Sequence, residues 1–459
     1  MNFREFLKKH RVAAAVFVLA LVVRLALFFM YLQYNEGDFI ATIRGADGYF
    51  EISENLIAGN GYSENSAPPY VPNSLRPPAW IVLMAGIAKV FGSYLPVFIF
   101  QLLLSSVIPL IGMSLAGRVV PLQYTSIVGV LLALEPAAVY SSTMVVSETS
   151  FTFLFLLFCV FLFKYVDTRK TREIVTSGVF LGLAILVKPT VQFLPVLIPL
   201  VLLLMYRKKL SISLFKQMIY FVAVCALVLA PWLYRNQKTF GVLGLTSQPA
   251  YNLYTVLVPT VLSLDTGASY ESEQKIYADT LTARGDTITL ANSKEYIAES
   301  VSIFRQHKVA FVKSLGISIV TFFTHDHMLT VLGYGGVRIP NLLHKPALVL
   351  LLTDPAQLLR DIRLYALSPG ILVLLVRLFW VAITLLFFFG AWSYFRREKF
   401  SPTAFLTIFL VAYFAVMTAA NGFGMNGRFR IPINAFLFIF ALYGFFAFRE
   451  YVRKFFTHA

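Results

Sequence analysis

Charged residues are scarce in this chain of 459 residues. They make up 14% of it, and 23 Asp or Glu stand against 39 Lys or Arg. A soluble domain usually carries about 25% charged residues. Because hydrophobic residues reach 58%, the composition excludes an ordinary soluble globular protein. The chain has 2 cysteines, Cys159 and Cys225, and both fall in apolar stretches, so they give no information about disulfides or redox compartment.

Nucleotide-binding signatures are also missing. The sequence has neither a P-loop nor a glycine-rich turn after a strand, so a nucleotide donor or cofactor is not expected. The net charge of +16 would point to nucleic acid in a soluble protein. In an apolar chain we assign it to loop cations that set membrane topology and meet anionic membrane lipids. No nucleic-acid partner is therefore expected.

Apolar stretches of about 20 residues recur without strand-like alternation, which predicts an all-α polytopic membrane protein rather than a β-barrel. Clusters of Lys and Arg, expected on the cytoplasmic side, separate many of them. These clusters lie at 8–11, 164–172, 207–209, 396–399 and 449–454. About ten spans with both termini inside fit this pattern. They are expected at 12–32, 95–115, 124–139, 151–165, 175–187, 191–205, 219–233, 370–389, 403–419 and 433–448.

Three polar intervals belong to the outer side under this topology, within one membrane domain covering 1–459. Residues 35–80 form the first extracytoplasmic loop, and 237–308 form a variable extracytoplasmic region. Residues 309–369 are interpreted as interfacial or re-entrant, because one more crossing there would place Arg396 to Lys399 outside. We expect a multi-pass protein of the plasma (inner) membrane, with its functional face on the extracytoplasmic side.

Cations on the outer side are not explained by topology, and they suggest an anionic substrate such as a lipid phosphate. The guanidinium group binds phosphate oxygens in a bidentate manner. The candidate phosphate ligands are Arg76, Lys188, Arg428 and Arg430.

Two acids on the same face, Asp47 and Glu148, could serve a group transfer in which a carboxylate takes a proton from a hydroxyl. Asp47 precedes a helical stretch, so a plain helix cap is the alternative reading. Glu148 could equally be an acid at a helix start.

His325, Asp326 and His327 form a polar cluster late in the chain. Two His flanking an Asp could bind a divalent metal if a further ligand were present. The other interpretation is a polar patch that orders an acceptor. Arg24 and Arg377 lie within apolar segments and are expected to face the bundle interior or to extend toward an interface.

Motifs spread over most of the chain resemble the GT-C superfamily of polyprenyl-phosphate-sugar-dependent glycosyltransferases, near the protein O-mannosyltransferases, the lipid A aminoarabinose transferase and the Rgt-type lipopolysaccharide glycosyltransferases. The matching stretches are Asp47-Gly-Tyr, Gly59-Asn-Gly-Tyr62, Arg76-Pro-Pro78, Glu135-Pro136, Ser147-Glu148, Lys188-Pro189, Trp232 with Arg235-Asn236, and Arg428-Phe-Arg-Ile-Pro432.

The resemblance implies a GT-C-type bundle with interfacial helices and assigns roles to its residues. Asp47 would be the catalytic base, and Glu148 would assist it. Arg76 would meet the lipid phosphate, with Arg428 or Arg430 as a second contact and Lys188 as a further candidate.

The expected function is inverting transfer of a sugar from a polyprenyl-phosphate carrier to an extracytoplasmic lipid-linked glycan, lipopolysaccharide or protein. It would need no metal and no cofactor beyond the lipid-linked donor. Three alternatives stay open: a flippase for polyprenyl-linked saccharides, an O-antigen ligase or polymerase, and a non-enzymatic membrane scaffold. A flippase should show internal repeats or paired broken spans.

Overall fold

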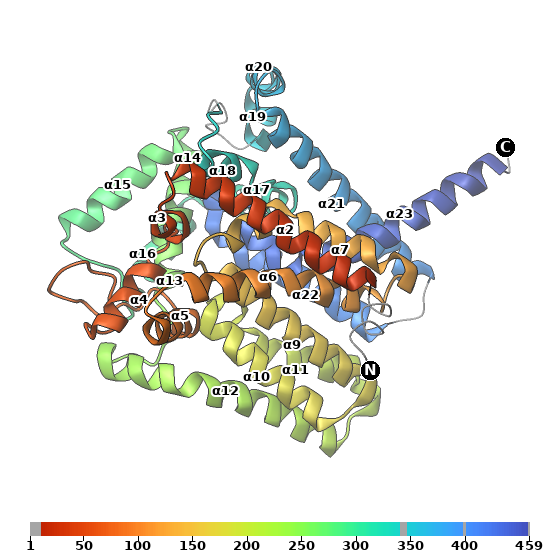
Figure 1. Ribbon diagram of the computed structural model, residues 1–459, viewed down its shortest axis with the longest axis horizontal. Coiled ribbons are helices and arrows are strands. Elements are labelled where there is room, and N and C mark those ends of the chain that lie inside the picture. Colours follow the sequence, from red (N-terminus) through yellow and green to blue (C-terminus); the bar gives the residue numbers. More distant parts are fainter. Residues whose placement is uncertain (1–10, 340–346, 398–400, 458–459) are drawn as a thin grey trace.

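The computed structural model describes residues 11–339, 347–397 and 401–457. Within these residues every regular element is a helix (Figure 1). Backbone groups in a membrane must pair among themselves, and a helix achieves this within one segment. The prediction of an all-α polytopic protein is confirmed. Of the cations assigned to the cytoplasmic side, Lys8, Lys9 and Lys399 lie outside the described residues.

Seven helical stretches in the described chain are long and apolar enough to cross a membrane. Each overlaps a span expected from the sequence, because about 20 apolar residues at 1.5 Å per residue match the hydrocarbon thickness. They are α2 (Arg11–Tyr34), α6 (Leu95–Ala116), α9 (Glu148–Thr168), α12 (Ile212–Phe240), α21 (Ile371–Arg397), and the stretches Pro402–Gly424 and Gly427–Lys454, which contain α22 (Pro402–Thr418) and α23 (Asn434–Thr457).

Two further helix pairs are bent, and each is either one broken span or a re-entrant segment. Helix α7 (Thr125–Leu134) meets α8 (Pro136–Ser142) at 56°, and α17 (Lys308–Thr324) meets α18 (Met328–Tyr334) at 65°. If each pair is one span, the described chain has up to nine, so the predicted count of about ten spans is not confirmed. Helices α10 (Thr171–Val187) and α11 (Leu194–Met205), both expected to span, are 17 and 12 residues long.

The first break has a local cause. Pro136 lacks a backbone N–H and disfavours helical geometry in the residue before it. Glu135 accordingly adopts an extended conformation, with φ −63° and ψ 118°. Its side chain then caps the new helix by accepting a hydrogen bond of 2.7 Å from the amide of Ala138.

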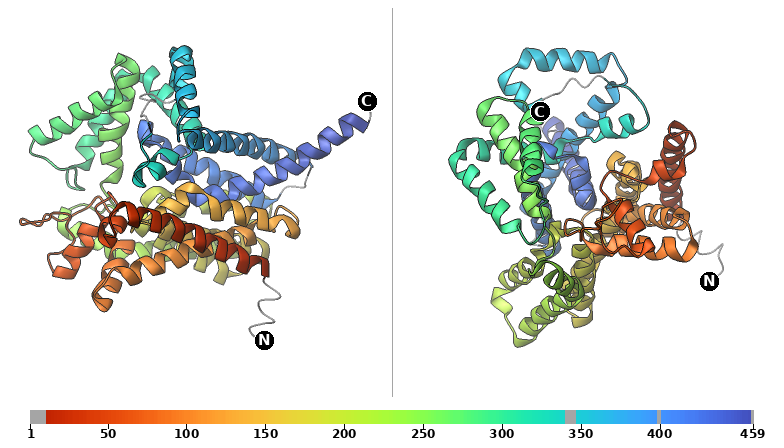
Figure 2. Two further views of the ribbon diagram at one scale, coloured as in Figure 1. Left: turned by 45° about the horizontal axis from the view of Figure 1, so that its top comes forward. Right: turned by 90° about the vertical axis from the view of Figure 1, so that its left-hand side faces the viewer.

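The helices pack in three groups that are visible in Figure 2. Helices α2, α6 and α7 form one group, α9, α10 and α12 a second, and α21 with α23 a third. Glycines permit the closest approaches. A Cβ atom built at Gly390 of α21 would lie 2.0 Å from the carbonyl oxygen of Phe440 on α23. At Gly182 of α10, it would lie 2.8 Å from Val228 on α12.

Short helices cover one end of the bundle, on the left in Figure 1. The interval 35–80 contributes α3 (Phe39–Ile43), α4 (Tyr49–Ala58) and the start of α5 (Pro78–Phe91). The interval 237–308 contributes α13 (Gln248–Asn252), η4 (Leu253–Leu257), α14 (Val258–Thr266), α15 (Tyr270–Ala283) and α16 (Ser293–Gln306). Helices α19 (Ala347–Thr353) and α20 (Pro355–Ala366) precede α21.

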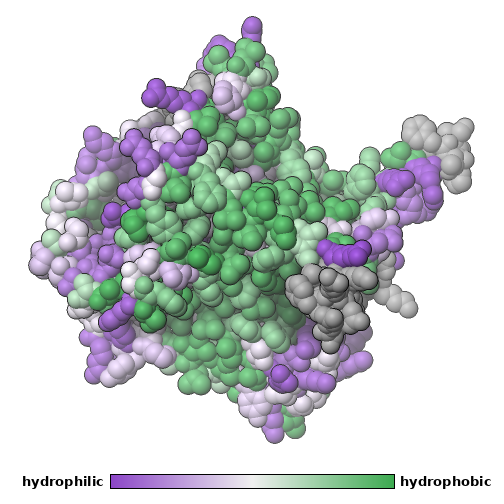
Figure 3. Space-filling view, viewed as in Figure 1, coloured by the Kyte–Doolittle hydropathy of each residue, from purple (hydrophilic) through white to green (hydrophobic). Residues whose placement is uncertain are grey.

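Figure 3 shows the consequence at the surface: hydrophilic side chains gather at two ends of the molecule, and an apolar band lies between them. Helices α9, α10 and α12 run between these ends. The start of α9, the ends of α10 and α12, and the turn η6 (Gly427–Ile433) that precedes α23 all reach the end that carries the interval 35–80.

Candidate active site

Asp47 lies in the turn that leads into α4, and its carboxylate faces two arginines. Oδ2 accepts a 2.8 Å hydrogen bond from Nη2 of Arg428, which is 381 residues away in sequence. Oδ1 lies 3.9 Å from Nη2 of Arg76, farther than a hydrogen bond. The cap of α4 is Gly48, at φ 74°, and no side chain caps this helix. The helix-cap interpretation of Asp47 therefore has no support in the geometry.

Glu148 is the first residue of α9, and it is 2% exposed. Its Oε1 accepts a 2.8 Å hydrogen bond from Nζ of Lys188, at the end of α10. Nε of Arg428 lies 2.9 Å from the same oxygen, in an orientation that does not align a hydrogen bond. Arg428 thus connects Asp47 to Glu148. Oε2 of Glu148 has no hydrogen-bond partner among the described residues, which leaves one acceptor for a bound molecule.

Arg76 is fixed by a network around its backbone. Its N–H donates to Oδ1 of Asn73 at 3.0 Å, and its carbonyl accepts from the hydroxyl of Tyr62 at 3.1 Å. Its guanidinium stands over the ring of Tyr49, with Cζ 5.5 Å from the centroid. Pro77 and Pro78 follow as the cap and the first residue of α5. The side chain is held at the site, while its Nε remains without a partner in the described chain.

Tyr49 is the first residue of α4, directly after the turn that carries Asp47. Its hydroxyl donates a 3.0 Å hydrogen bond to Oγ of Ser147, next to Glu148. Burial raises the pKa of Tyr49 to about 12, against the opposing effect of the Arg76 guanidinium. The phenol therefore stays neutral at physiological pH and acts as a donor.

Glu64 closes the other side of the turn. A Cβ atom at Gly48 would lie 2.1 Å from Oε1 of Glu64. Burial raises the pKa of Glu64, partly offset by the charge of Arg76. Oε2 accepts a 3.0 Å hydrogen bond from Asn73. Asn73 thereby links this acid to the backbone of Arg76.

Arg430 has a different environment from Arg428. It is fully buried, donates to the carbonyl oxygens of Phe322 at 2.7 Å and His325 at 2.8 Å, and stacks over Trp380 with Cζ 3.4 Å from the ring. These contacts tie η6 to the end of α17 and to α21. The structure does not bring Arg430 to the Asp47 cluster, in contrast to its predicted contact with phosphate.

His325, Asp326 and His327 form the bend between α17 and α18. Nδ1 of His325 accepts hydrogen bonds from the backbone N–H groups of His327 at 3.0 Å and Gly427 at 3.1 Å. Asp326 is paired with Arg377 on α21, its Oδ2 2.5 Å from Nε. In the residues that the structure describes, no group of three or more His, Cys, Asp or Glu could hold a metal. The metal interpretation therefore lacks a ligand set there.

His327 is the member of this cluster with free polar atoms. It is 2% exposed, and both ring nitrogens lack a partner in the described chain. Its ring stands edge-on to Tyr140, with centroids 5.2 Å apart, and its Cβ faces Gly427, next to Arg428. An acceptor contact by His327 stays a prediction.

Sequence reasoning missed the residues that hold the site together. Tyr49, Tyr62 and Asn73 position Asp47 and Arg76. Arg235 on α12 donates a 3.1 Å hydrogen bond to the carbonyl of Asn73 and stands over Trp232 at 4.7 Å. Most of these residues lie within the motifs that resemble the GT-C superfamily: Tyr49, Tyr62, Trp232 and Arg235. The motifs therefore marked the residues, but residue type alone did not indicate that they position the site.

A family model described as dolichyl-phosphate-mannose-protein mannosyltransferase matches residues 75–234, which include Arg76, Glu148 and Lys188. No curated protein matches the chain.

Among solved structures, the archaeal oligosaccharyltransferase AglB from Archaeoglobus fulgidus, in complex with an inhibitory peptide and a dolichol-phosphate, is similar at TM-score 0.50 and 14% identity. The match covers 99% of this chain and 52% of AglB, so the chain spans about half the length of that protein.

ArnT from Cupriavidus metallidurans matches in its apo state at TM-score 0.38, 14% identity, 93% of this chain and 76% of ArnT. Bound to undecaprenyl phosphate, it matches at TM-score 0.39, 15% identity, 93% and 77%. At these identities the likeness concerns the fold alone.

Proposed function

Because the chain has the fold of the GT-C glycosyltransferases, we propose that it is an inverting glycosyltransferase whose donor sugar is carried on a polyprenyl phosphate. The observation that carries the proposal is the position of Arg428. It joins Asp47 and Glu148, which come from different parts of the chain. Arg76 lies next to Asp47, and Lys188 pairs with Glu148. Three cations thus surround a pair of carboxylates in one place.

Each group has a chemical task in this reaction. The acceptor hydroxyl attacks the anomeric carbon from the face opposite the phosphate, and its proton passes to Asp47. Oδ1 is available for that proton because Arg76 lies 3.9 Å from it. The bond between the anomeric carbon and the phosphate oxygen breaks, and its electron pair leaves with the phosphate. Cations near that oxygen stabilise the growing negative charge.

Arg76 and Lys188 are the proposed ligands of the leaving phosphate, and Arg428 is the cation that bridges the two acids and offsets their mutual repulsion. Glu148, with Oε2 free, orients the acceptor hydroxyl. None of these steps uses a metal, and the lipid-linked donor supplies its own leaving group. The proposal places this site on the extracytoplasmic side of the plasma membrane, with a lipid-linked glycan, lipopolysaccharide or protein as acceptor.

The acceptor region is proposed to include a cavity of about 720 Å³ in the interval 237–308. It lies against α15, and its lining includes Tyr251, Thr255, Glu271, Gln274 and Lys275. Such a volume is in the range of small-ligand sites, about 300–1,000 Å³. The lining also includes Ala278, Leu281 and Ile288, so a glycan bound there would meet both polar side chains and apolar surface.

The test is sugar transfer from a polyprenyl-phosphate sugar by purified protein in lipid nanodiscs. Asp47→Asn should lower kcat about 10²–10⁴-fold, because a general base contributes that much. Asp38→Asn is the matched control. Asp38 caps α3 in the same interval through Ala41 N–H, and Asn caps a helix equally well, so its activity should be unchanged.

Full activity in folded Asp47→Asn protein would remove the assignment of the base. A flippase would instead move the lipid-linked sugar across the bilayer without forming a new glycosidic bond. Detection of such movement, with no transfer to any acceptor, would replace the proposal with that alternative.

A further inference from the structure

The end of the bundle opposite Asp47 contains a basic cavity of about 880 Å³. It lies where α9 has ended, α11 ends and α12 begins, with η3 (Arg207–Lys209) across it. Its lining includes Arg169, Arg207, Lys208, Lys209, Ser211 and Ser213. The cavity is as large as the pockets that hold small ligands.

Four of the lining residues are cations, and none is Asp or Glu. The nearby acid Asp167 is already paired with Arg118 at 2.7 Å. Membrane topology alone explains why cations collect on one face. It does not require that they surround a hollow.

The backbone around the cavity is fixed. Gln217 donates to the carbonyl of Arg169 at 3.1 Å and to Thr171 at 3.2 Å, while its own carbonyl oxygen accepts from Tyr165 at 2.7 Å. Arg169 has φ 58°, and its guanidinium lies 3.3 Å from the ring centroid of Tyr206. These contacts place one cation in the wall of the cavity.

The start of α12 adds a second attraction for anions. Ser211 caps this helix of 29 residues by accepting the amide of Leu214 at 3.1 Å. The other amides of the first turn have no partner within the helix, and the helix dipole favours negative charge there. Ser211 and Ser213 both line the cavity.

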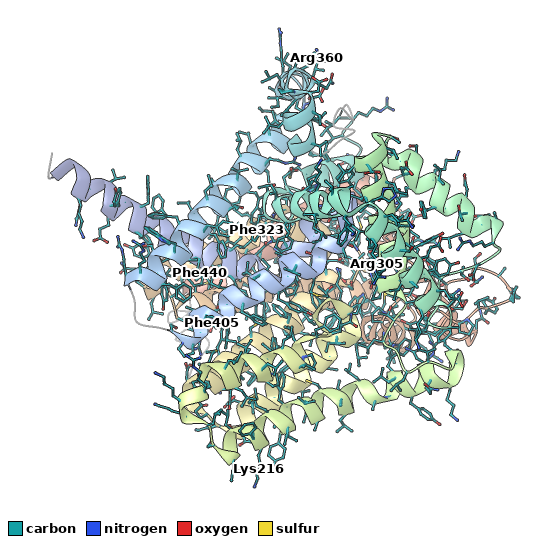
Figure 4. All side chains as sticks on the ribbon, turned by 180° about the vertical axis from the view of Figure 1, so that it is seen from behind. Lys216, Arg305, Phe323, Arg360, Phe405 and Phe440 are labelled. Carbon is teal, nitrogen blue, oxygen red and sulfur yellow. The ribbon has the colours of Figure 1, made fainter. Side chains whose placement is uncertain are left out.

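An apolar hollow of about 310 Å³ continues from the basic one. It is lined by Val201, Leu204, Met205, Arg207 and Phe405, so the two share Met205 and Arg207. Leu204 is 68% exposed, as expected for a side chain that faces lipid. Figure 4 labels Phe405 on α22 and Lys216 near the start of α12, both on the side of the molecule away from Arg305 of α16.

We propose that these joined hollows bind one anionic phospholipid. Its phosphate lies among Arg169, Arg207 and Lys208 at the start of α12, and an acyl chain lies along Leu204 and Phe405. A soluble anion would use only the basic hollow, whereas a lipid uses both. Basic pockets between membrane helices on the cytoplasmic side are suited to anionic head groups. The lipid would hold the ends of α9, α11 and α12 together, and this role does not depend on the transfer reaction.

The experiment measures binding of phosphatidylglycerol to the purified full chain in detergent, by native mass spectrometry and by the shift in melting temperature. Phosphatidylcholine is the neutral comparison. Wild type should bind phosphatidylglycerol and gain thermal stability, and phosphatidylcholine should give neither effect. In Arg207→Gln/Lys208→Gln protein, affinity should fall about fivefold for each cation removed.

Lys170→Gln/Arg172→Gln protein is the matched control. Both residues are exposed at the same end of the bundle, and neither lines the cavity. Equal weakening in the control would show only a general surface attraction and would overturn the site. So would equal binding of phosphatidylcholine by wild type.

Two further arms identify the ligand. Leu204→Ser should weaken phosphatidylglycerol binding and leave any binding of glycerol phosphate unchanged. Glycerol phosphate or inorganic phosphate binding as tightly as the lipid would overturn the lipid assignment. Tighter binding of undecaprenyl phosphate than phosphatidylglycerol, sensitive to the Arg207→Gln/Lys208→Gln change, would replace the phospholipid with the carrier lipid.

Discussion

Arg428 is the residue on which the proposed site depends most, because both carboxylates contact its guanidinium. A planar guanidinium presents donors in fixed directions, whereas an ammonium is a point charge on one atom. Arg428→Lys should keep the positive charge, but one ammonium group cannot contact Asp47 and Glu148 from two different nitrogen atoms as the guanidinium does. We expect kcat to fall about 10²–10³-fold, the scale seen when one electrostatic contact of a site is removed. The measurement is the transfer assay, with binding of undecaprenyl phosphate followed in parallel.

The control for this change is Arg44→Lys. Arg44 lies in the same interval but pairs with Glu51 and is 54% exposed, and exposed pairs contribute little. Its activity should match that of wild type. If Arg428→Lys also kept full activity, the geometry of the guanidinium would not matter to the reaction.

At the scale of single residues, Glu64 also predicts how the stability of the protein depends on pH. Burial raises its pKa, so the folded state holds a proton more tightly than the unfolded chain does. The contribution of Glu64 to the free energy of unfolding is then fully present at pH values below its pKa in the unfolded chain. It is lost as the pH rises through its higher pKa in the folded protein. Glu64→Gln keeps the acceptor for Asn73 and removes the ionisation. Because Glu64 keeps an exposed side, the effect should be small: its melting temperature should slightly exceed that of wild type at pH 7, and the two should converge toward pH 4.

Convergence is the outcome that tests the cause. If Glu64→Gln were more stable by the same amount at every pH, packing rather than ionisation would be responsible. If it were less stable at pH 7, the attraction of Arg76 would outweigh burial, and the direction of the shift would be wrong.

At the scale of elements, the crossing of α21 and α23 depends on two glycines. A Cβ at Gly390 would lie 2.0 Å from the carbonyl oxygen of Phe440, and one at Gly444 would lie 2.2 Å from that of Leu386. Backbone atoms in packed helices cannot give way, so the helices would have to separate. Gly390→Ala should lower the melting temperature clearly.

Gly86→Ala in α5 is the matched control, because nothing lies within 4 Å of a Cβ there. Replacing Gly by Ala in a helix is favourable by roughly 0.5–1 kcal/mol when space permits, so this variant should be as stable as wild type or more so. A harmless Gly390→Ala change would mean that the two helices can move apart freely.

The positions of the long helices could be predicted from the sequence, whereas the contacts that join them at the site could not. The apolar stretches located α2, α6, α9 and α12 because length and hydropathy decide a span. The contact of Asp47 with Arg428 joins residues 381 positions apart, and no local pattern encodes it. Motif resemblance suggested both residues, but it could not choose between Arg428 and Arg430.

The choice follows from the turn that carries them. Arg428 and Arg430 lie two residues apart in η6, a 3-10 helix, where residues three apart share a face. Their side chains therefore leave the turn in different directions. One reaches Asp47, and the other reaches the carbonyls of α17. Only the packing of α17 and α21 against η6 determines which arginine faces the site.

At the scale of the whole molecule, the two charged ends imply opposite sides of a membrane. Cations dominate the cavity at the start of α12, and the proposal places that end in the cytoplasm. The acids and arginines of the Asp47 cluster then face the other compartment. Sidedness can be measured directly, because both native cysteines are buried and a thiol reagent that cannot cross membranes should leave them unmodified.

Single cysteines placed at exposed residues would report each end. Ser272→Cys lies on α15 beside the proposed acceptor region, and Thr168→Cys lies at the end of α9 near the basic cavity. Both replacements are small and neutral, so they leave the charge balance that sets topology unchanged. An impermeant maleimide should label Ser272→Cys from outside intact cells and Thr168→Cys only in inverted vesicles. The reverse pattern would put the Asp47 cluster in the cytoplasm, and labelling of both from one side would contradict the crossing of α9 itself.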